Sequence, residues 1–186
     1  MILPLFRRGR RDDSIERLYG AIVAQARLPV FYAGYDVPDS VEGRLDMIML
    51  HTVLVLERTE AAGEPLKALG QAVFDRFCQD MDDNLREMGV GDLAVPKQMQ
   101  RIAGAFYGRA RVYRPALASA EQGLLVEALH RNIYQARSGA EPQARRLARY
   151  VRDAAAHLRE IGEADLAAGQ INYPEPAGSA AAVTER

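Results

Sequence analysis

The segment PLKALGQAVFDRFCQDMDDNLREMG, residues 65–89, carries the strongest helical pattern in this chain. Its apolar side chains recur at steps of mostly three and four residues, which places them on one face of a helix. These side chains are Leu66, Leu69, Val73, Phe74, Phe77, Met81, Leu85 and Met88. Proline is favoured at a first helical position and glycine just after the last one, so Pro65 and Gly89 mark the ends. The segment is therefore predicted to form one long helix with a buried face.

Helical spacing continues on both sides of this segment, and no alternating strand pattern of useful length occurs. Together with the segment above, the predicted helices cover residues 14–28, 40–62, 65–88, 96–114, 117–138 and 142–161. The second of these is apolar nearly all round, which predicts a place in the middle of a bundle. The aromatic-rich residues 30–38 are expected to be an irregular connection. The fold class predicted is all-α, a single-domain bundle of about six helices with disordered termini.

Composition and charge exclude several classes of protein. The chain has 186 residues, 48% of them hydrophobic and 26% charged, which suits one ordinary globular domain. A net charge of −1 argues against a nucleic-acid binder, because such domains usually carry a strong basic excess. The single cysteine, Cys78, leaves no intrachain disulfide and favours a reducing compartment. The longest apolar run, residues 47–56, falls far short of the roughly 20 residues of a membrane-spanning helix.

Both ends of the chain differ in composition from the body. Residues 1–11, MILPLFRRGRR, form an apolar-basic arm, residues 12–171 the helical domain, and residues 172–186 a disordered tail. The arm is either a frayed terminus or a weak membrane-surface tether. In the second case its cations would face an anionic leaflet, where each contributes on the order of 1 kcal/mol. These cations are Arg7, Arg8, Arg10 and Arg11.

No catalytic or metal-binding constellation emerges from the sequence. The segment 80–84 begins like a calcium loop, but Leu85 and Gly91 stand where such a loop has glycine and glutamate. A magnesium-binding acidic pair of the prenyl-synthase kind would need an aspartate where Arg86 stands. Cys78 is expected to be a small buried apolar residue and not a nucleophile. The three histidines, His51, His130 and His157, lack the spacing of zinc ligands. His51 is expected to be a hydrogen-bonded core residue. We therefore predict no metal, no cofactor and no enzymatic activity.

Charges are segregated along one predicted hairpin. Residues 75–92 hold six acids and two arginines, whereas residues 93–120 hold no acid. The basic residues of the second stretch are Lys97, Arg101, Arg109, Arg111 and Arg114. The two helices of the hairpin could neutralise each other along their length. Alternatively, the arginines and neighbouring aromatic residues could form an exposed recognition surface, since Arg and Tyr are enriched at interface hot spots.

Four sequence blocks resemble one known family. They are EGRLDMIMLH at residues 42–51, QDMDDNLREMGVGD at 79–92, VPK at 95–97 and AFYGR at 105–109. Together these blocks resemble the ubiquinol–cytochrome c chaperone family, and the resemblance covers about residues 15–135. The chain begins without a long targeting extension, which suggests a bacterial member at the cytoplasmic face of the inner membrane.

The resemblance implies an assembly chaperone that binds newly made cytochrome b and supports assembly of ubiquinol–cytochrome c reductase. It also implies a small helper protein or the ribosome as further partners, and no catalysis. The expected docking surface lies around the hairpin. Its residues are Asp80, Asp82, Asp83, Arg86, Gly89, Gly91, Asp92, Lys97, Phe106, Tyr107, Arg109 and Tyr113.

Two other functions stay open at this point. The first is a helical lipid- or quinone-binding protein at the inner membrane surface, with the aromatic residues 30–35 closing over an apolar pocket. The second is an enzyme that uses the acidic cluster with a divalent ion.

Overall fold

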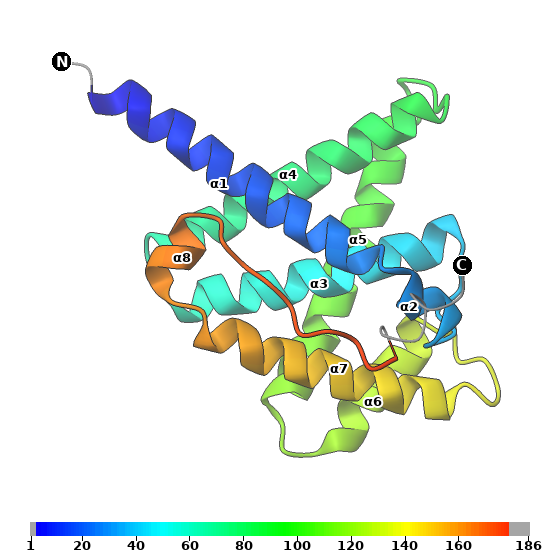
Figure 1. Ribbon diagram of the computed structural model, residues 1–186. Coiled ribbons are helices and arrows are strands. Elements are labelled where there is room, and N and C mark those ends of the chain that lie inside the picture. Colours follow the sequence, from blue (N-terminus) through cyan, green and yellow to red (C-terminus); the bar gives the residue numbers. More distant parts are fainter. Residues whose placement is uncertain (1–2, 179–186) are drawn as a thin grey trace, which may run out of the picture.

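The computed structural model describes the backbone of residues 3–178 and the side chains of residues 12–178. Within these residues the chain forms eight helices and no strand, which confirms the all-α fold class (Figure 1). The helices are α1 (Leu3–Ala26), α2 (Pro29–Ala33), α3 (Val41–Ala61), α4 (Leu66–Glu87), α5 (Val95–Ala118), α6 (Gln122–Asn132), α7 (Glu141–Glu160) and α8 (Glu163–Ala167).

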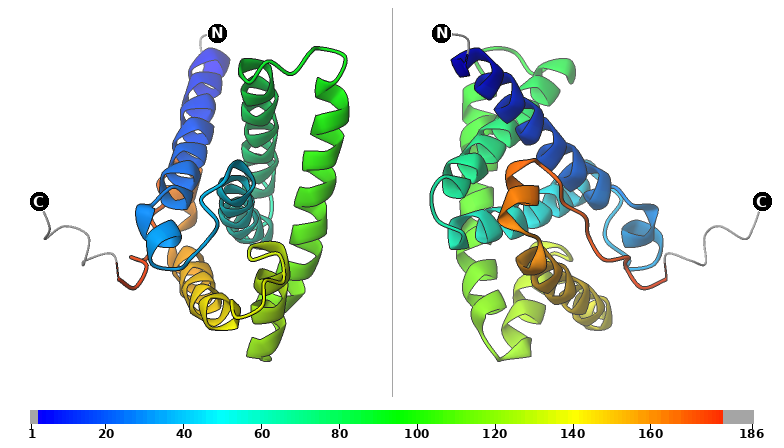
Figure 2. Two further views of the ribbon diagram at one scale, coloured as in Figure 1. Left: turned by 90° about the vertical axis from the view of Figure 1, so that its right-hand side faces the viewer. Right: turned by 60° about the vertical axis from the view of Figure 1, so that its left-hand side comes forward.

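Helix α3 lies in the middle of the bundle, as its apolar sequence predicts. It lies among α1, α4, α5 and α7 and contacts all four (Figure 2). Every residue from 47 to 55 is buried. The side chain of Ser40 caps its first turn by accepting a hydrogen bond from the backbone N–H of Gly43 at 3.1 Å. The central helix therefore sets the positions of the four helices around it.

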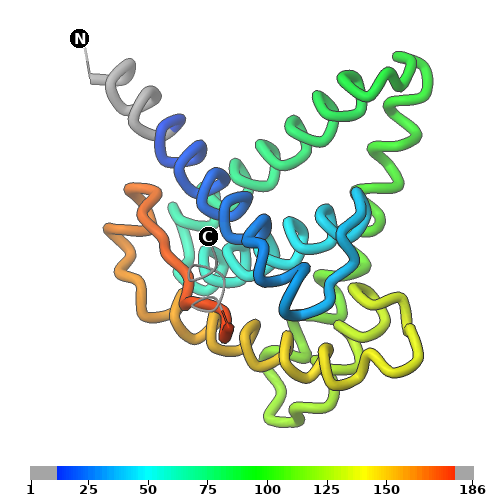
Figure 3. Tube along the Cα trace, turned by 45° about the vertical axis from the view of Figure 1, so that its right-hand side comes forward, coloured from blue at the N-terminus to red at the C-terminus, as the bar shows by residue number. Residues whose placement is uncertain are grey.

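Helices α4 and α5 form a long antiparallel hairpin whose outer end leaves the body. The loop between them, residues 88–94, projects away from α6 and α7 (Figures 1 and 3). The inner half of α4 buries the predicted apolar stripe, whereas Met88 at its outer end is exposed. The hairpin thus has a packed base and an outer end open to solvent.

Some element boundaries differ from those that the sequence predicted. Helix α1 begins at Leu3, well before the predicted start at residue 14, and continues without a break to Ala26. Residues 29–33 form the short helix α2 instead of an irregular connection, because Pro29 occupies a favoured helix-start position and Phe31 packs into the core.

Helix α5 continues past Pro115 to Ala118, whereas the predicted helix ended at residue 114. Because this proline lies in the last turn, it removes only one late backbone hydrogen bond. Arg152 of α7 donates to the carbonyl oxygens of Ala116 and Ser119 at 3.2 and 3.3 Å and so satisfies acceptors at the end of the helix. Leu117 consequently belongs to α5 and not to the next helix.

The chain beyond α8 packs on the body up to the last described residue. Leu166 is fully buried, and the ring of Tyr173 lies 5.3 Å from the ring of His51, centroid to centroid. Arg146 donates a hydrogen bond to the carbonyl oxygen of Ala177 at 2.6 Å. The packed chain therefore extends beyond the boundary predicted at residue 172, and the rest of the predicted tail, residues 179–186, lies outside the described part.

His51 is a hydrogen-bonded core residue, as predicted. Its Nδ1 lies 2.8 Å from the carbonyl oxygen of Met47, which only accepts, so Nδ1 carries the proton. The Tyr150 hydroxyl therefore donates to Nε2 at 2.8 Å, and Gln25 donates to that hydroxyl at 3.0 Å. Complete burial lowers the pKa of His51 to about 4. The ring is thus neutral and joins α3 to α7 and α1.

We expect Gly70→Ala to lower the free energy of unfolding by about 1–3 kcal/mol, because α3 and α4 approach closely at this position. A methyl group there would overlap Thr59 Oγ1 and lie 3.0 Å from Thr59 Cβ. Denaturant unfolding measures the change. Gly104→Ala is a matched control in the exposed part of α5, where nothing lies within 4 Å, and there alanine should stabilise the helix slightly. Equal stabilities for the two variants would contradict the predicted overlap.

Candidate partner-binding site on the α4–α5 hairpin

The loop of the hairpin follows directly from its glycines. Gly89 has φ of +81°, which side chains disfavour, and its N–H donates to the Arg86 carbonyl oxygen at 2.9 Å. The next N–H, from Val90, reaches back to the Leu85 carbonyl oxygen at 3.0 Å, a pattern that closes a helix C-terminus. The Gly91 carbonyl oxygen then accepts from Ala94 at 2.7 Å and starts the return. Gly89 and Gly91 therefore shape the turn, as predicted.

The outer end of the hairpin combines exposed apolar and charged side chains. Leu93 is 100% exposed and Met88 is 65% exposed. Arg86 holds the end together by pairing with Asp82 at 2.6 Å and with Asp92 at 2.5 Å. Asp83 and Lys97 are exposed on the two sides of the loop. These residues, 82–97, form what we call the hairpin end.

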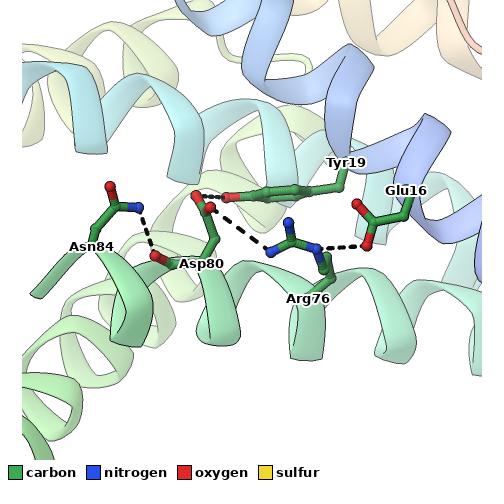
Figure 4. Close-up of polar contacts among 5 residues, drawn as sticks. All are labelled: Glu16, Tyr19, Arg76, Asp80 and Asn84. Atoms are coloured by element: carbon green, nitrogen blue, oxygen red, sulfur yellow. Dashed lines mark hydrogen bonds and ion pairs between the residues drawn. The ribbon is translucent and has the colours of Figure 1, made fainter. Parts of the chain in front are cut away.

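Asp80 belongs to a different environment, the contact between α4 and α1 (Figure 4). Its Oδ2 accepts a 2.7 Å hydrogen bond from the Tyr19 hydroxyl, and its Oδ1 lies 3.8 Å from Arg76 Nη1. Arg76 in turn pairs with Glu16 of α1 at 2.7 Å. Burial, and then the hydrogen bond to Asp80, raise the pKa of Tyr19. Asp80 therefore fastens α1 to α4, and its carboxylate is already occupied.

Two predicted aromatic anchors are core residues. Phe106 is 2% exposed and Tyr113 is fully buried, which corrects their expected place on a docking surface. Phe106 packs against Phe74 and Phe77 of α4, with ring centroids 4.8 and 5.5 Å apart. Both residues point inward because they occupy the face of α5 that closes the bundle. Tyr107, by contrast, is 60% exposed and stays available.

Arg109 forms an ion pair with Asp46 of α3. Its Nη2 lies 2.5 Å from Asp46 Oδ1, and its Nη1 donates to the Ala105 carbonyl oxygen at 3.2 Å. The Asp46 side chain is 8% exposed and that of Arg109 is 19% exposed. Burial raises the pKa of Asp46 to about 6 although the Arg109 charge acts in the opposite direction. Arg109 is thus mainly a link between α5 and α3, not a free recognition residue.

The segregated charges of α4 and α5 do not neutralise each other. Among the described residues, no ion pair joins an acid of α4 to a basic residue of α5. Two of the α5 arginines pair with α3: Arg109 contacts Asp46 at 2.5 Å, and Arg114 contacts Glu57 at 2.8 Å and Glu60 at 2.7 Å. The α4 charges pair with α1, within α4 and with the loop. The opposite charges therefore serve to attach each helix to a different neighbour.

The sequence also raised the possibility of an aromatic lid, a metal site and a membrane-surface arm. Phe31 and Tyr35 are at most 1% exposed and pack on Tyr150, so residues 30–35 supply core side chains and not a lid. Within residues 12–178, no group of three or more potential ligands is placed to hold a metal ion. The side chains of the N-terminal arginines, Arg7, Arg8, Arg10 and Arg11, lie outside the described residues. None of the described helices is long and apolar enough to cross a membrane.

Comparison with known proteins shows the family. The model of the ubiquinol-cytochrome C chaperone family matches residues 34–173, well over half of the chain. This chain belongs to the ubiquinol–cytochrome c chaperone family. The predicted resemblance to this family is thereby confirmed, and the matched region contains both the hairpin and the Asp46–Arg109 pair.

Individual proteins similar to this chain are consistent with its membership of the family. This chain is 24% identical over 158 residues to ubiquinol-cytochrome c reductase complex assembly factor 1 of Mus musculus and 23% identical to the same factor of Homo sapiens. The aligned region takes in 84% of this chain but only 53% and 52% of those proteins, so the chain spans about half their length. The crystal structure of the Cbp3 homolog from Brucella abortus is 42% identical, with a TM-score of 0.84 over 94% of this chain and 97% of that one.

The sequence blocks that carry the resemblance contain residues that join α3 to its neighbours. In the first block, Gly43 lets the backbone of Pro38 pass close by, Asp46 binds Arg109, and His51 binds Tyr150. Sequence reasoning missed the role of Asp46. The available signal was an acid between Leu45 and Met47 in an otherwise apolar stretch, since a buried carboxylate normally requires a partner.

Proposed function

We propose that this protein is an assembly chaperone that holds newly made cytochrome b during assembly of ubiquinol–cytochrome c reductase. Membership of the ubiquinol–cytochrome c chaperone family supports this function. The name of the Mus musculus relative, a reductase complex assembly factor, agrees with it. On this proposal the chain acts by binding a protein, with no chemical step of its own.

The hairpin end is the surface that best fits such a client. The observation that carries this assignment is the pair of exposed apolar side chains, Met88 and Leu93, on a loop that projects from the body. Apolar side chains rimmed by charges are typical of protein-binding surfaces. Asp83, Arg86 and Asp92 supply that rim. A membrane subunit awaiting assembly exposes both apolar segments and charged loops, which such a surface can accept.

The site also differs from the one that the sequence predicted. It keeps Asp82, Asp83, Arg86, Asp92 and Lys97. Tyr107 is exposed but lies outside residues 82–97, and Phe106 and Tyr113 are excluded because they are buried. We place the protein at the cytoplasmic face of the inner membrane, where the N-terminal arginines would attract anionic lipids. A small helper protein and the ribosome are the further partners that this proposal includes.

The double substitution Met88→Glu and Leu93→Glu tests the surface. We expect it to reduce crosslinking to newly made cytochrome b by about tenfold or more, because two apolar anchors become charged. The melting temperature should stay nearly unchanged, since both side chains are exposed.

Leu124→Glu serves as the matched control, because it adds an acid at a 41% exposed leucine on α6, away from the hairpin end. Crosslinking should persist in this variant. If the double variant captures cytochrome b as well as the unaltered chain does, the hairpin end is not the client surface.

A further inference from the structure

A pocket of about 520 Å³ opens between α3, α5 and α6, on the solvent side of the Asp46–Arg109 pair. Its volume falls in the range of small-molecule sites, roughly 300–1,000 Å³. One part of the lining is apolar and comes from Leu45, Met49 and Ile102. The pocket therefore has a surface on which a hydrocarbon group can rest.

The polar part of the lining is rich in hydrogen-bond donors. Arg101 and Arg131 are exposed and form no ion pair among the described residues. The one hydrogen bond of the Arg101 guanidinium is a long one, 3.4 Å, to Gln98. Of the two acids in the lining, Asp46 is occupied by Arg109, which leaves Glu42. Two free arginines thus face one acid, and the remaining charge is positive.

One buried donor beside the pocket lacks a partner. It is Nε of Arg109, a residue that contributes to the lining. Buried donors in folded proteins are almost always paired, so an unpaired one calls for an acceptor from outside the chain. A bound group with acceptor oxygens would supply it.

The backbone at the pocket rim is strained. Gln135 and Ala136 both have φ of +53°, a left-handed conformation that non-glycine residues rarely adopt, and here two such residues follow one another. Both line the pocket. Strained backbone of this kind concentrates at binding sites, where the surrounding structure holds it in place.

We propose that this pocket binds a small amphipathic anion, a carboxylate or phosphate group attached to a short hydrocarbon chain. Arg101 and Arg131 donate charge-assisted hydrogen bonds to the anionic oxygens. The hydrocarbon chain lies against Leu45 and Ile102. The site is separate from the hairpin end, so it adds a ligand to the proposed chaperone function without depending on it.

Isothermal titration calorimetry of the full chain tests this proposal with four probes: octyl phosphate, octanoate, inorganic phosphate and octanol. We expect one alkyl anion at least to bind about tenfold or more tightly than both inorganic phosphate and octanol, since only an alkyl anion uses both parts of the pocket. The preferred alkyl anion identifies the headgroup as phosphate or carboxylate. Equal binding of octanol, or no binding of either alkyl anion at millimolar concentration, would overturn the proposal.

Variants locate the site. Arg101→Gln combined with Arg131→Gln should weaken binding of the preferred alkyl anion by about tenfold or more. Arg149→Gln, which removes an exposed arginine of α7 outside this pocket, should leave the affinity unchanged. Ala105→Met fills the pocket without changing its charge and should also abolish binding. Undiminished binding in the double-glutamine variant would show that the anion binds elsewhere.

Discussion

Arg109→Ala should lower the free energy of unfolding by about 3–5 kcal/mol at neutral pH, because it leaves a buried carboxylate without its partner. The side chain of Asp46 is 8% exposed and forms an ion pair with Arg109 at 2.5 Å. Denaturant unfolding at pH 7 and at pH 5 measures the effect. The loss should shrink at the lower pH, since Asp46 takes up a proton below its pKa of about 6 and no longer carries a buried charge.

The control for Arg109→Ala is the same substitution at a nearby arginine that is exposed to solvent. Arg111→Ala removes an exposed arginine two positions along α5 and should change stability by less than about 0.5 kcal/mol. Asp46→Asn in the Arg109→Ala background should recover part of the lost stability, because it removes the unpaired charge itself. If Arg109→Ala and Arg111→Ala unfold at the same denaturant concentration, the ion pair contributes nothing to the stability of the fold.

His51 should make the protein less stable in mild acid. Its pKa is about 4 in the folded chain, against 6.5 for an ordinary histidine. Between these values the unfolded chain binds a proton that the folded core does not, so each step down in pH favours unfolding. The stabilisation from His51 is therefore complete above about pH 6.5 and falls by about 3 kcal/mol as the pH approaches 4.

Asp46 titrates in the same window with the opposite sign, so the unaltered protein alone does not isolate the histidine. Its raised pKa means that lowering the pH from about 6 favours the folded chain. Comparing the protein with His51→Gln at each pH removes this contribution, because Asp46 is present in both. The stability difference between the two should decrease by about 3 kcal/mol from pH 6.5 to pH 4. His157→Gln, on the more exposed α7 surface, is the control, and a constant difference for His51→Gln would refute the assignment.

The sequence predicted the helices well where periodicity and end signals agreed. The stripe from Leu66 to Met81, closed by Gly89, is the helix that the structure contains. Prediction was weaker where packing decides against a local signal. The predicted helix ended before Pro115, yet α5 continues to Ala118, where Arg152 donates to the Ala116 carbonyl oxygen. The aromatic residues 30–35 suggested a lid, yet Phe31 and Tyr35 fill the core.

The candidate site was predicted in part for the same reason. The hairpin, its glycine turn and its charged end follow from the order of residues along the chain. Helical spacing alone could not tell which face of α5 is turned inward, since Phe106 and Tyr107 are adjacent and differ from buried to exposed. Nor could it show that the Arg109 charge is met by Asp46, because that acid lies on a different helix.

By itself the sequence determined that this protein is all-helical, that α3 is central, and that it resembles the ubiquinol–cytochrome c chaperone family. These properties follow from short-range periodicity, helix-end residues and contiguous motif blocks, all of which are local in the chain. Only the tertiary structure decided which charges are free to bind a partner. Charged groups are satisfied by neighbours in space: Tyr19 donates a hydrogen bond to Asp80, and Asp46 forms an ion pair with Arg109. The distances along the chain between these residues carry no signal of the contact.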